Sequence, residues 1–145
     1  MNYAVGFIFS PNLEHVILIE KKRPEWQAGL LNGVGGKQEP NERRARDTMA
    51  RECLEETGLE IVADEWTMFA ELIEPKSHTR VVFFFTISDQ YNQARSTTDE
   101  RVGAYLTCDL RSRPTIPNLQ WLIPLAMDWD RQCAHSVMIM GKEKK

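Results

Sequence analysis

The sequence lacks any apolar run long enough to cross a membrane and any pattern of an N-terminal leader. No stretch approaches the roughly 18 apolar residues of a transmembrane helix, and no basic segment followed by a long apolar run stands at the N-terminus. Cysteine is scarce, since Cys53, Cys108 and Cys133 form no CxxC pair and are odd in number. These absences predict a cytoplasmic protein with reduced, mostly buried thiols and no membrane contact.

Basic clusters, internal repeats and low-complexity segments are missing as well. The net charge is -3, and the one basic tail, 142–145, is short and contains Glu143. A dedicated nucleic-acid binder usually shows a basic face, so this class is disfavoured. With 145 residues, 42% apolar and 27% charged, the chain has the size and composition of one globular domain. We therefore expect one domain over residues 1–145, a monomer or homodimer acting on a small molecule.

Apolar periodicity and turn residues predict a mixed sheet with two helices packed on it. The turn composition Ser10-Pro11-Asn12 joins the first two strands into a hairpin. The apolar run 81–85 does not alternate, as is typical of a central strand covered on both faces. Gly58 stands where a glycine would end the first helix. The expected strands cover residues 3–9, 15–20, 66–73, 81–87, 102–107 and 136–140, and the expected helices cover 45–57 and 119–133.

The first helix carries an acidic ridge. At about 100° per residue from Met49, the glutamates Glu55, Glu52 and Glu56 fall at about 240°, 300° and 340°. The opposite arc, which we expect to pack on the sheet, comprises Met49, Ala50, Cys53, Leu54 and Thr57.

This ridge opposes helix stability. Like charges three or four residues apart each cost about 0.2–0.5 kcal/mol, and carboxylates at the helix C-terminus face the negative end of the dipole, at about 0.3–1 kcal/mol each. A hard divalent cation reverses the sign of these terms, because Mg²⁺ and Ca²⁺ take oxygen ligands. The alternative is a merely solvated helix face, and the loop that precedes the helix distinguishes the two interpretations.

That loop is rich in glycine and leads directly into the ridge. Gly33, Gly35 and Gly36 let the backbone approach a ligand closely. From Gly36 the chain runs through Glu42 to the segment Arg51-Glu52-Cys53-Leu54-Glu55-Glu56-Thr57-Gly58-Leu59.

This assembly resembles the Nudix box: Gly, five residues, Glu, seven residues, Arg-Glu, an aliphatic, any residue, Glu-Glu, any residue, Gly, an aliphatic. Gly36 and Glu42 fit the first spacing, and residues 51–59 fit the second half. Two departures are visible. Eight residues, 43–50, separate Glu42 from Arg51, which leaves the role of Glu42 open, and Cys53 replaces the aliphatic, a small change at a buried apolar position.

The resemblance implies an α/β/α sandwich around a mixed sheet, with the box as a loop–helix–loop. It also implies a hydrolase that uses Mg²⁺, or Mn²⁺, to cut a nucleoside diphosphate linked to another group. Glu52, Glu55 and Glu56 would be metal ligands, together with the Gly35 carbonyl. Arg51 would orient the carboxylates by pairing with Glu52 or Glu55.

The general base stays open at this point. Glu52 is one candidate, and Glu100 is another because several family members use a glutamate from a downstream loop. For Glu100, a solvated loop position is the alternative.

The substrate is indicated by two stretches, 31–37 and 116–125, which resemble those of the MutT-like oxidised-purine nucleoside triphosphatases of the family. Asn32 would read a purine edge, since its amide offers a donor and an acceptor, and Lys37 would also contact substrate. Asn118 and Trp121 would line the base pocket. The alternatives are a turn-capping Asn32 and a core Trp121, and Trp26 could cover a base or a phosphate.

The leading substrate is therefore a purine nucleoside triphosphate, oxidised or not, cleaved to monophosphate and pyrophosphate. The runner-up is a nucleotide sugar such as ADP-ribose. A module that senses a nucleotide without hydrolysing it is the alternative from another class, although the box glutamates that such modules usually lose are all present.

Overall fold

The computed structural model describes residues 1–132 and 137–140. Within these ranges the strands are β1 (Asn2–Phe9), β2 (His15–Glu20), β3 (Leu31–Asn32), β4 (Val34–Lys37), β5 (Thr67–Glu74), β6 (Thr79–Ile87), β7 (Arg101–Leu106) and β8 (Val137–Met140). The helices are α1 (Ala45–Thr57) and α2 (Leu119–Gln132), with short 3-10 turns η1 (Glu25–Gln27), η2 (Ala63–Glu65), η3 (Tyr91–Gln93) and η4 (Thr107–Ser112). None of the helices in these ranges is long and apolar enough to span a membrane.

The strands form one mixed sheet in the order β3-β2-β1-β6-β5-β8, while β4 pairs with β1 and β7 pairs with β2. The predicted hairpin is confirmed, since β1 and β2 pair antiparallel with Phe9 opposite Val16. Strand β6 lies parallel to β1 and antiparallel to β5. It is therefore the central strand that the unalternating run 81–85 predicted.

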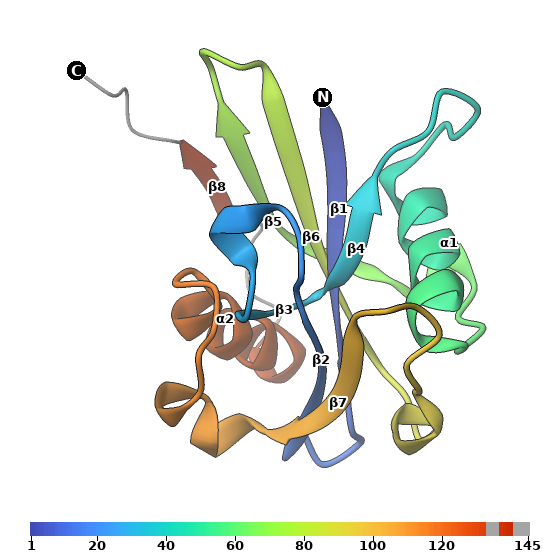
Figure 1. Ribbon diagram of the computed structural model, residues 1–145, viewed down its shortest axis with the longest axis vertical. Coiled ribbons are helices and arrows are strands. Elements are labelled where there is room, and N and C mark those ends of the chain that lie inside the picture. The colour runs from blue at the N-terminus through green and yellow to red at the C-terminus, as the bar shows by residue number, and fades with distance from the viewer. Residues whose placement is uncertain (133–136, 141–145) are drawn as a thin grey trace.

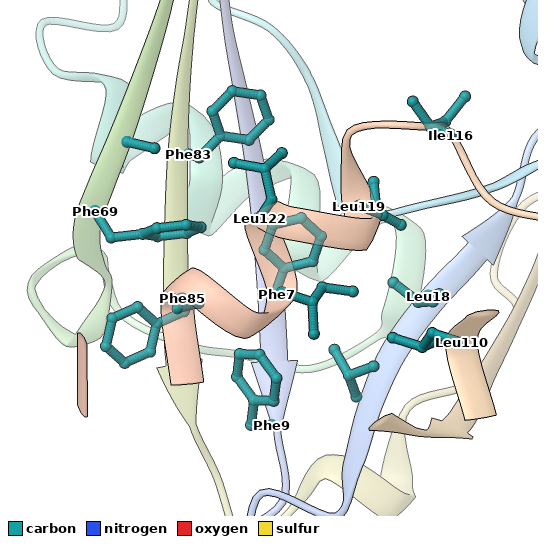
Figure 2. Packing of buried hydrophobic residues seen from close by; sticks show 14 of the residues in the cluster. Phe7, Phe9, Leu18, Phe69, Phe83, Phe85, Leu110, Ile116, Leu119 and Leu122 are labelled. Atoms are coloured by element: carbon teal, nitrogen blue, oxygen red, sulfur yellow. The ribbon is translucent and has the colours of Figure 1, made fainter. Parts of the chain in front are cut away.

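The two helices cover opposite faces of the sheet (Figure 1). Successive side chains of a strand point to opposite faces, so β6 supplies both cores: Phe83 and Phe85 pack in the cluster under α2, and Val82 and Phe84 in the cluster under α1. Under α2, aromatic rings from β1, β5 and β6 gather against Leu119 and Leu122 (Figure 2). This arrangement confirms the predicted α/β/α sandwich.

Helix α1 has the bounds that the sequence predicts. At its start the Arg44 N–H donates to the Asp47 carboxylate, at 3.1 Å, which satisfies a backbone donor outside the helix. At its end Gly58 adopts a left-handed φ of 74° and donates its N–H to the Leu54 carbonyl. The second predicted helix is also found and is described to Gln132, so Cys133 lies outside the described residues, as does Ser136 of the last predicted strand.

Two details of the predicted burial are wrong. Leu54 is exposed although it was placed on the buried arc of α1, and Glu56 is buried although it was placed on the acidic ridge away from the core. The helical projection assumed that one flank of α1 packs on the sheet, whereas α1 packs against two of its strands, β1 and β4. Of the two cysteines in the described ranges, Cys53 is buried as expected, but Cys108 is exposed.

Candidate active site

Strand β4 contains Gly35 and Gly36 of the glycine-rich segment and lies against the acidic helix α1. It pairs antiparallel with β1, with Val5 opposite Gly35, and packs on α1. A Cβ on Gly35 would collide with the carbonyl oxygen of Ala4, and a Cβ on Gly36 would collide with the carboxylate of Glu52. Gly35 therefore requires glycine, because a backbone atom cannot turn aside, whereas a side chain at Gly36 would displace the Glu52 carboxylate. The backbone of β4 thus lies directly against the glutamates of α1.

One guanidinium organises three carboxylates. Arg51 donates from Nε to Glu42 at 2.6 Å, and from Nη1 to Glu52 at 2.8 Å and to Glu55 at 3.1 Å. Its Nη2 donates to the backbone carbonyl of Lys37 at 3.0 Å. A planar guanidinium presents its donors in a fixed fork, so these bonds fix both the carboxylates and the loop. The contacts of Arg51 with Glu52 and Glu55 are those the sequence predicted.

Glu42, whose role was open, belongs to this network. Besides Arg51, its carboxylate accepts from the Thr48 hydroxyl at 2.7 Å and from the Glu39 N–H at 2.8 Å. Burial would raise the pKa of Glu42, but the hydrogen bonds from Arg51, Glu39 and Thr48 outweigh it and lower the pKa. The inserted residue thus leaves Glu42 in contact with Arg51. The match of Glu42 to the first glutamate of the Nudix box was the feature of the sequence that pointed to a role in this network.

The three helix glutamates have different surroundings. The Glu55 side chain is 55% exposed, whereas Glu52 is largely covered and Glu56 is 7% exposed. Glu56 accepts one hydrogen bond, from the Gly35 N–H at 2.9 Å. Burial raises the pKa of Glu52, and it raises the pKa of Glu56 to about 7, helped by the nearby charges of Glu52 and Glu100. Negative charge at Glu56 is therefore under-compensated.

These donors fit a hard divalent cation by their chemistry. Carboxylate and carbonyl oxygens are the ligands that Mg²⁺ prefers, and a buried carboxylate with a raised pKa is stabilised by a nearby cation. No three Asp, Glu, His or Cys side chains among residues 1–132 and 137–140 are arranged to grip a metal as they stand. Glu52 and Glu55 are turned toward Arg51 instead. Their role as ligands stays a prediction.

Glu100 is buried and occupied at both oxygens. One oxygen contacts Lys21 Nζ at 2.9 Å, and the other accepts the Lys22 N–H at 2.6 Å. Burial would raise the pKa of Glu100, but these bonds and the Lys21 charge outweigh it and lower the pKa. The charges of Lys21 and Glu100 both act on Glu56, and that of Lys21 lowers its pKa. Lys21 and Glu100 therefore lie close to the acidic helix. The solvated-loop alternative is therefore wrong, whereas the role of general base stays a prediction.

Sequence reasoning did not single out Lys21. It follows directly on strand β2 and is part of a Lys-Lys-Arg run, which is the one signal that could have indicated it. The structure places its ammonium group against the buried Glu100 carboxylate.

A cleft of about 390 Å³ holds two of the predicted base-reading residues. Asn32 and Asn118 both line it, and so does Trp26, which is 66% exposed. The other lining residues are mostly apolar: Tyr3, Val5, Pro24, Gln27, Leu72, Thr79, Val81 and Phe83. Apolar walls with a few polar groups are typical of small-molecule sites.

The polar groups of this cleft offer both donors and acceptors. Asn32 accepts from the Gly33 N–H at 2.8 Å and donates to Gln27 Oε1 at 3.3 Å. Asn118 Oδ1 is buried and has no hydrogen-bond partner in the part of the chain that the structure describes. A buried acceptor without a partner costs about 1–3 kcal/mol, so a ligand that donates to Asn118 would relieve this penalty.

The cleft and the acidic helix are linked through two paired residues. Val5 lines the cleft and lies opposite Gly35, whose N–H bonds Glu56. Lys37 lines a separate hollow with Arg51 and Glu52. Of the other predicted substrate residues, Trp121 does not line the cleft and is 43% exposed.

The position of Trp121 follows from its helix. The buried stripe of α2 runs through Leu119, Leu122, Ile123 and Ala126. Trp121 precedes Leu122, and a step of one residue turns the side chain by about 100° around the helix. Trp121 is therefore not the core tryptophan of the alternative interpretation.

The fold and the site define a class of protein: an α/β/α sandwich in which a glycine-rich strand meets a helix of Arg and Glu beside a ligand-sized cleft. The family model described as the NUDIX domain matches residues 2–117. The chain belongs to the Nudix family of hydrolases, as its signature indicates. Comparison with curated protein sequences gives no match.

Solved structures of related fold agree. One is MutT, from the pair of Aliivibrio salmonicida and Vibrio cholerae proteins, at 17% identity over 87% of this chain and 95% of that chain, with a TM-score of 0.67. Another is the NUDIX domain of Shewanella oneidensis NrtR complexed with ADP ribose, at 15% identity over 88% and 86% of the two chains, with a TM-score of 0.68. A third is the MutT protein of Bacillus halodurans, at 17% identity over 85% and 79%, with a TM-score of 0.62. At these identities the likeness concerns the fold.

Proposed function

We propose that the protein hydrolyses the diphosphate linkage of a purine nucleoside triphosphate, oxidised or not, to a monophosphate and pyrophosphate with Mg²⁺ or Mn²⁺. The observation that supports it is the link between the cleft and the helix. Asn32 and Asn118 line a cleft whose wall residue Val5 pairs with Gly35, the donor to Glu56. A base in the cleft would therefore place its phosphates near the carboxylates.

In this proposal the box residues have three roles: they bind the cation, position the carboxylates and contact the phosphates. Glu52, Glu55, Glu56 and the Gly35 carbonyl would hold the cation, which when bound neutralises phosphate charge and lowers the pKa of a water. Arg51 keeps Glu52 and Glu55 in place through its fork of donors. Lys37 would contact a phosphate from the hollow that it shares with Arg51 and Glu52.

Two carboxylates remain candidates for the proton acceptor. Glu52 is largely covered and burial raises its pKa, which moves a carboxylate toward the range of a useful base. Glu100 starts from a lowered pKa with both oxygens bonded, so it would first have to release Lys21 or the Lys22 amide. Glu52 is bonded to Arg51 at one oxygen, whereas Glu100 is bonded at both, so we favour Glu52.

Base recognition falls to the cleft. Metal ions and carboxylates meet only phosphate oxygens, which all nucleotides share, whereas the amides of Asn32 and Asn118 can pair with a purine edge. Trp26 stands exposed at the same cleft and offers a stacking face. ADP-ribose remains the second candidate, because the NrtR domain of similar fold was solved with ADP ribose.

A panel of nucleoside triphosphates, oxidised purine triphosphates and ADP-ribose, assayed with Mg²⁺ and with products separated by chromatography, tests the proposal. We expect purine triphosphates to give monophosphate and pyrophosphate. Glu56→Gln should lower the rate by orders of magnitude, and Glu60→Gln, at an exposed glutamate beyond the helix, should not. Release of inorganic phosphate alone, or turnover of ADP-ribose far above any triphosphate, would contradict it.

Metal binding is tested separately by calorimetry. The Glu55→Gln and Glu56→Gln variants should each weaken Mg²⁺ or Mn²⁺ binding, and Glu60→Gln should leave it unchanged.

Binding of nucleotide without any turnover in the unaltered protein would instead support the alternative function, a module that senses a nucleotide without hydrolysing it.

A further inference from the structure

A second hollow, of about 330 Å³, lies on the face of the sheet opposite the cleft. Strand β6 shows the relation: Val81 and Phe83 line the cleft, and the alternating residues Val82 and Phe84 line the hollow. Side chains that alternate along a strand stand on opposite faces. The hollow, between the start of α1 and strands β5 and β6, is therefore separate from the cleft. It shares its face of the sheet with α1, but it lies at the start of the helix, whereas Glu52, Glu55 and Glu56 lie toward its end.

Among the described residues, four arginines and no acidic side chain line this hollow. They come from the start of α1 and its preceding loop and from β6, and they are Arg43, Arg44, Arg46 and Arg80. The amides of Asn2 and Gln38 complete the polar lining. In a chain of net charge -3, this hollow therefore concentrates positive charge and hydrogen-bond donors.

Two of the arginines are already neutralised. Arg44 pairs with Asp47 at 2.8 Å and with Asp64 at 3.1 Å, and Arg80 pairs with Glu71. These ion pairs compensate the charges of Arg44 and Arg80, and they leave the uncompensated positive charge of the hollow to the other two arginines.

Arg43 and Arg46 have no carboxylate partner among the residues that the structure describes. Arg43 is exposed. The Arg46 Nε donates to the Trp66 carbonyl at 3.0 Å, and its guanidinium lies 5.9 Å from the centre of the Phe84 ring. These contacts hold the Arg46 side chain in place but leave its charge unpaired.

We infer that the hollow binds a phosphate-bearing small molecule, with Arg43 and Arg46 as the ligands of the phosphate. Arginine matches phosphate oxygens with two parallel donors and is charged at all relevant pH values. The volume exceeds that of a single phosphate, and Met68, Val82 and Phe84 form an apolar floor, so an organic phosphate fits better than the bare ion. This site is independent of the proposed function.

The test is an NMR titration of the whole chain, freed of metal with EDTA, with AMP, inorganic phosphate and adenosine as separate probes. AMP should shift the amide signals of residues 43–47 and Arg80, and it should bind more tightly than either fragment. Arg43→Glu should weaken AMP binding at this site about tenfold or more, as expected for the loss of a charge-assisted hydrogen bond. Arg46→Gln should do the same.

Arg111→Glu is the matched control, because Arg111 is an exposed arginine at the hollow beside α2, under the other face of the sheet. It should leave AMP binding unchanged. Arg43→Glu alters an exposed side chain without an ion pair, so the variant should fold. Shifts confined to the cleft residues or to Lys37 and Arg51, or equal AMP affinity in the unaltered protein and Arg43→Glu, would overturn the inference.

Discussion

At the scale of single residues, the buried carboxylate of Glu56 carries the largest electrostatic strain of the site. Among the residues that the structure describes, it accepts a hydrogen bond from the Gly35 N–H alone, while the charges of Glu52 and Glu100 oppose its ionisation. A side chain chosen for stability alone would be neutral or paired here. A bound cation would recover the free energy that the folded protein loses by keeping this charge, as expected if Glu56 is a metal ligand.

Glu56 should make the metal-free protein less stable as the pH rises. Its pKa moves from 4.5 to about 7 on folding, so the folded state binds the extra proton between these values. Stability falls as the pH rises through this window, by up to about 3 kcal/mol, and the loss is complete above pH 7. Denaturant unfolding in EDTA at pH 5 and pH 8 measures it.

Glu56→Gln should remove this dependence, because glutamine carries no charge at either pH. The difference in unfolding free energy between the variant and the unaltered protein should therefore grow in favour of the variant from pH 5 to pH 8. Parallel stability curves for the two proteins would show that Glu56 does not titrate in this range.

Arg51→Lys tests the role of the guanidinium. Lysine keeps the charge but loses the planar fork that joins Glu42, Glu52 and Glu55. We expect kcat to fall more than KM rises, because the carboxylates lose their positions while the phosphate contacts remain. Steady-state kinetics with Arg111→Lys as control measures this. Normal turnover with only a raised KM would instead place Arg51 against the substrate.

At the scale of secondary structure elements, the packing of β4 between β1 and α1 depends on glycine. Gly35→Ala should destabilise the protein by about 2–4 kcal/mol, because its Cβ would collide with the Ala4 carbonyl, a backbone atom that cannot turn aside. Gly29→Ala is the control: it has open space around the Cβ and a φ of 82°, so it carries backbone strain alone, at about 1 kcal/mol. Equal losses in thermal unfolding would contradict the collision.

Most of the elements could be predicted from the sequence, but β3 and β4 were missed because the glycine-rich segment was interpreted as a loop. The bounds of α1 follow from local patterns, since the apolar period and Gly58 act over a few residues. The burial of Glu56 could not be predicted in this way. A helical projection uses only the helix sequence, and it carries no information on β4, which packs against the side of α1 that bears Glu56. The ion pair of Lys21 with Glu100 joins residues 79 positions apart, and no local pattern encodes such a contact.

At the scale of the whole molecule, the cleft joins parts of the chain that are distant in sequence. Asn32 ends β3, and Asn118 directly precedes α2. Their convergence in one cleft with Trp26 depends on how α2 closes over the sheet. Spacing alone could not show this, and the resemblance to purine triphosphatases was the one sign of it. Trp121 was proposed as a pocket residue on the same resemblance. It lies outside the cleft, because its position on α2 turns the side chain away from the buried stripe.

Base preference should therefore depend on the cleft and not on the box. Asn118→Ala and Asn32→Ala should flatten the preference among purine and pyrimidine triphosphates, because a polar group left unpaired by the wrong base costs about 1–3 kcal/mol, a ten- to hundredfold discrimination. The Mg²⁺ dependence should not change, since the two amides lie outside the glutamate network. Values of kcat/KM for the four triphosphates measure the effect, with Trp121→Ala as control at an exposed ring off the cleft. Equal hydrolysis of all four by the unaltered protein would mean that the cleft reads no base.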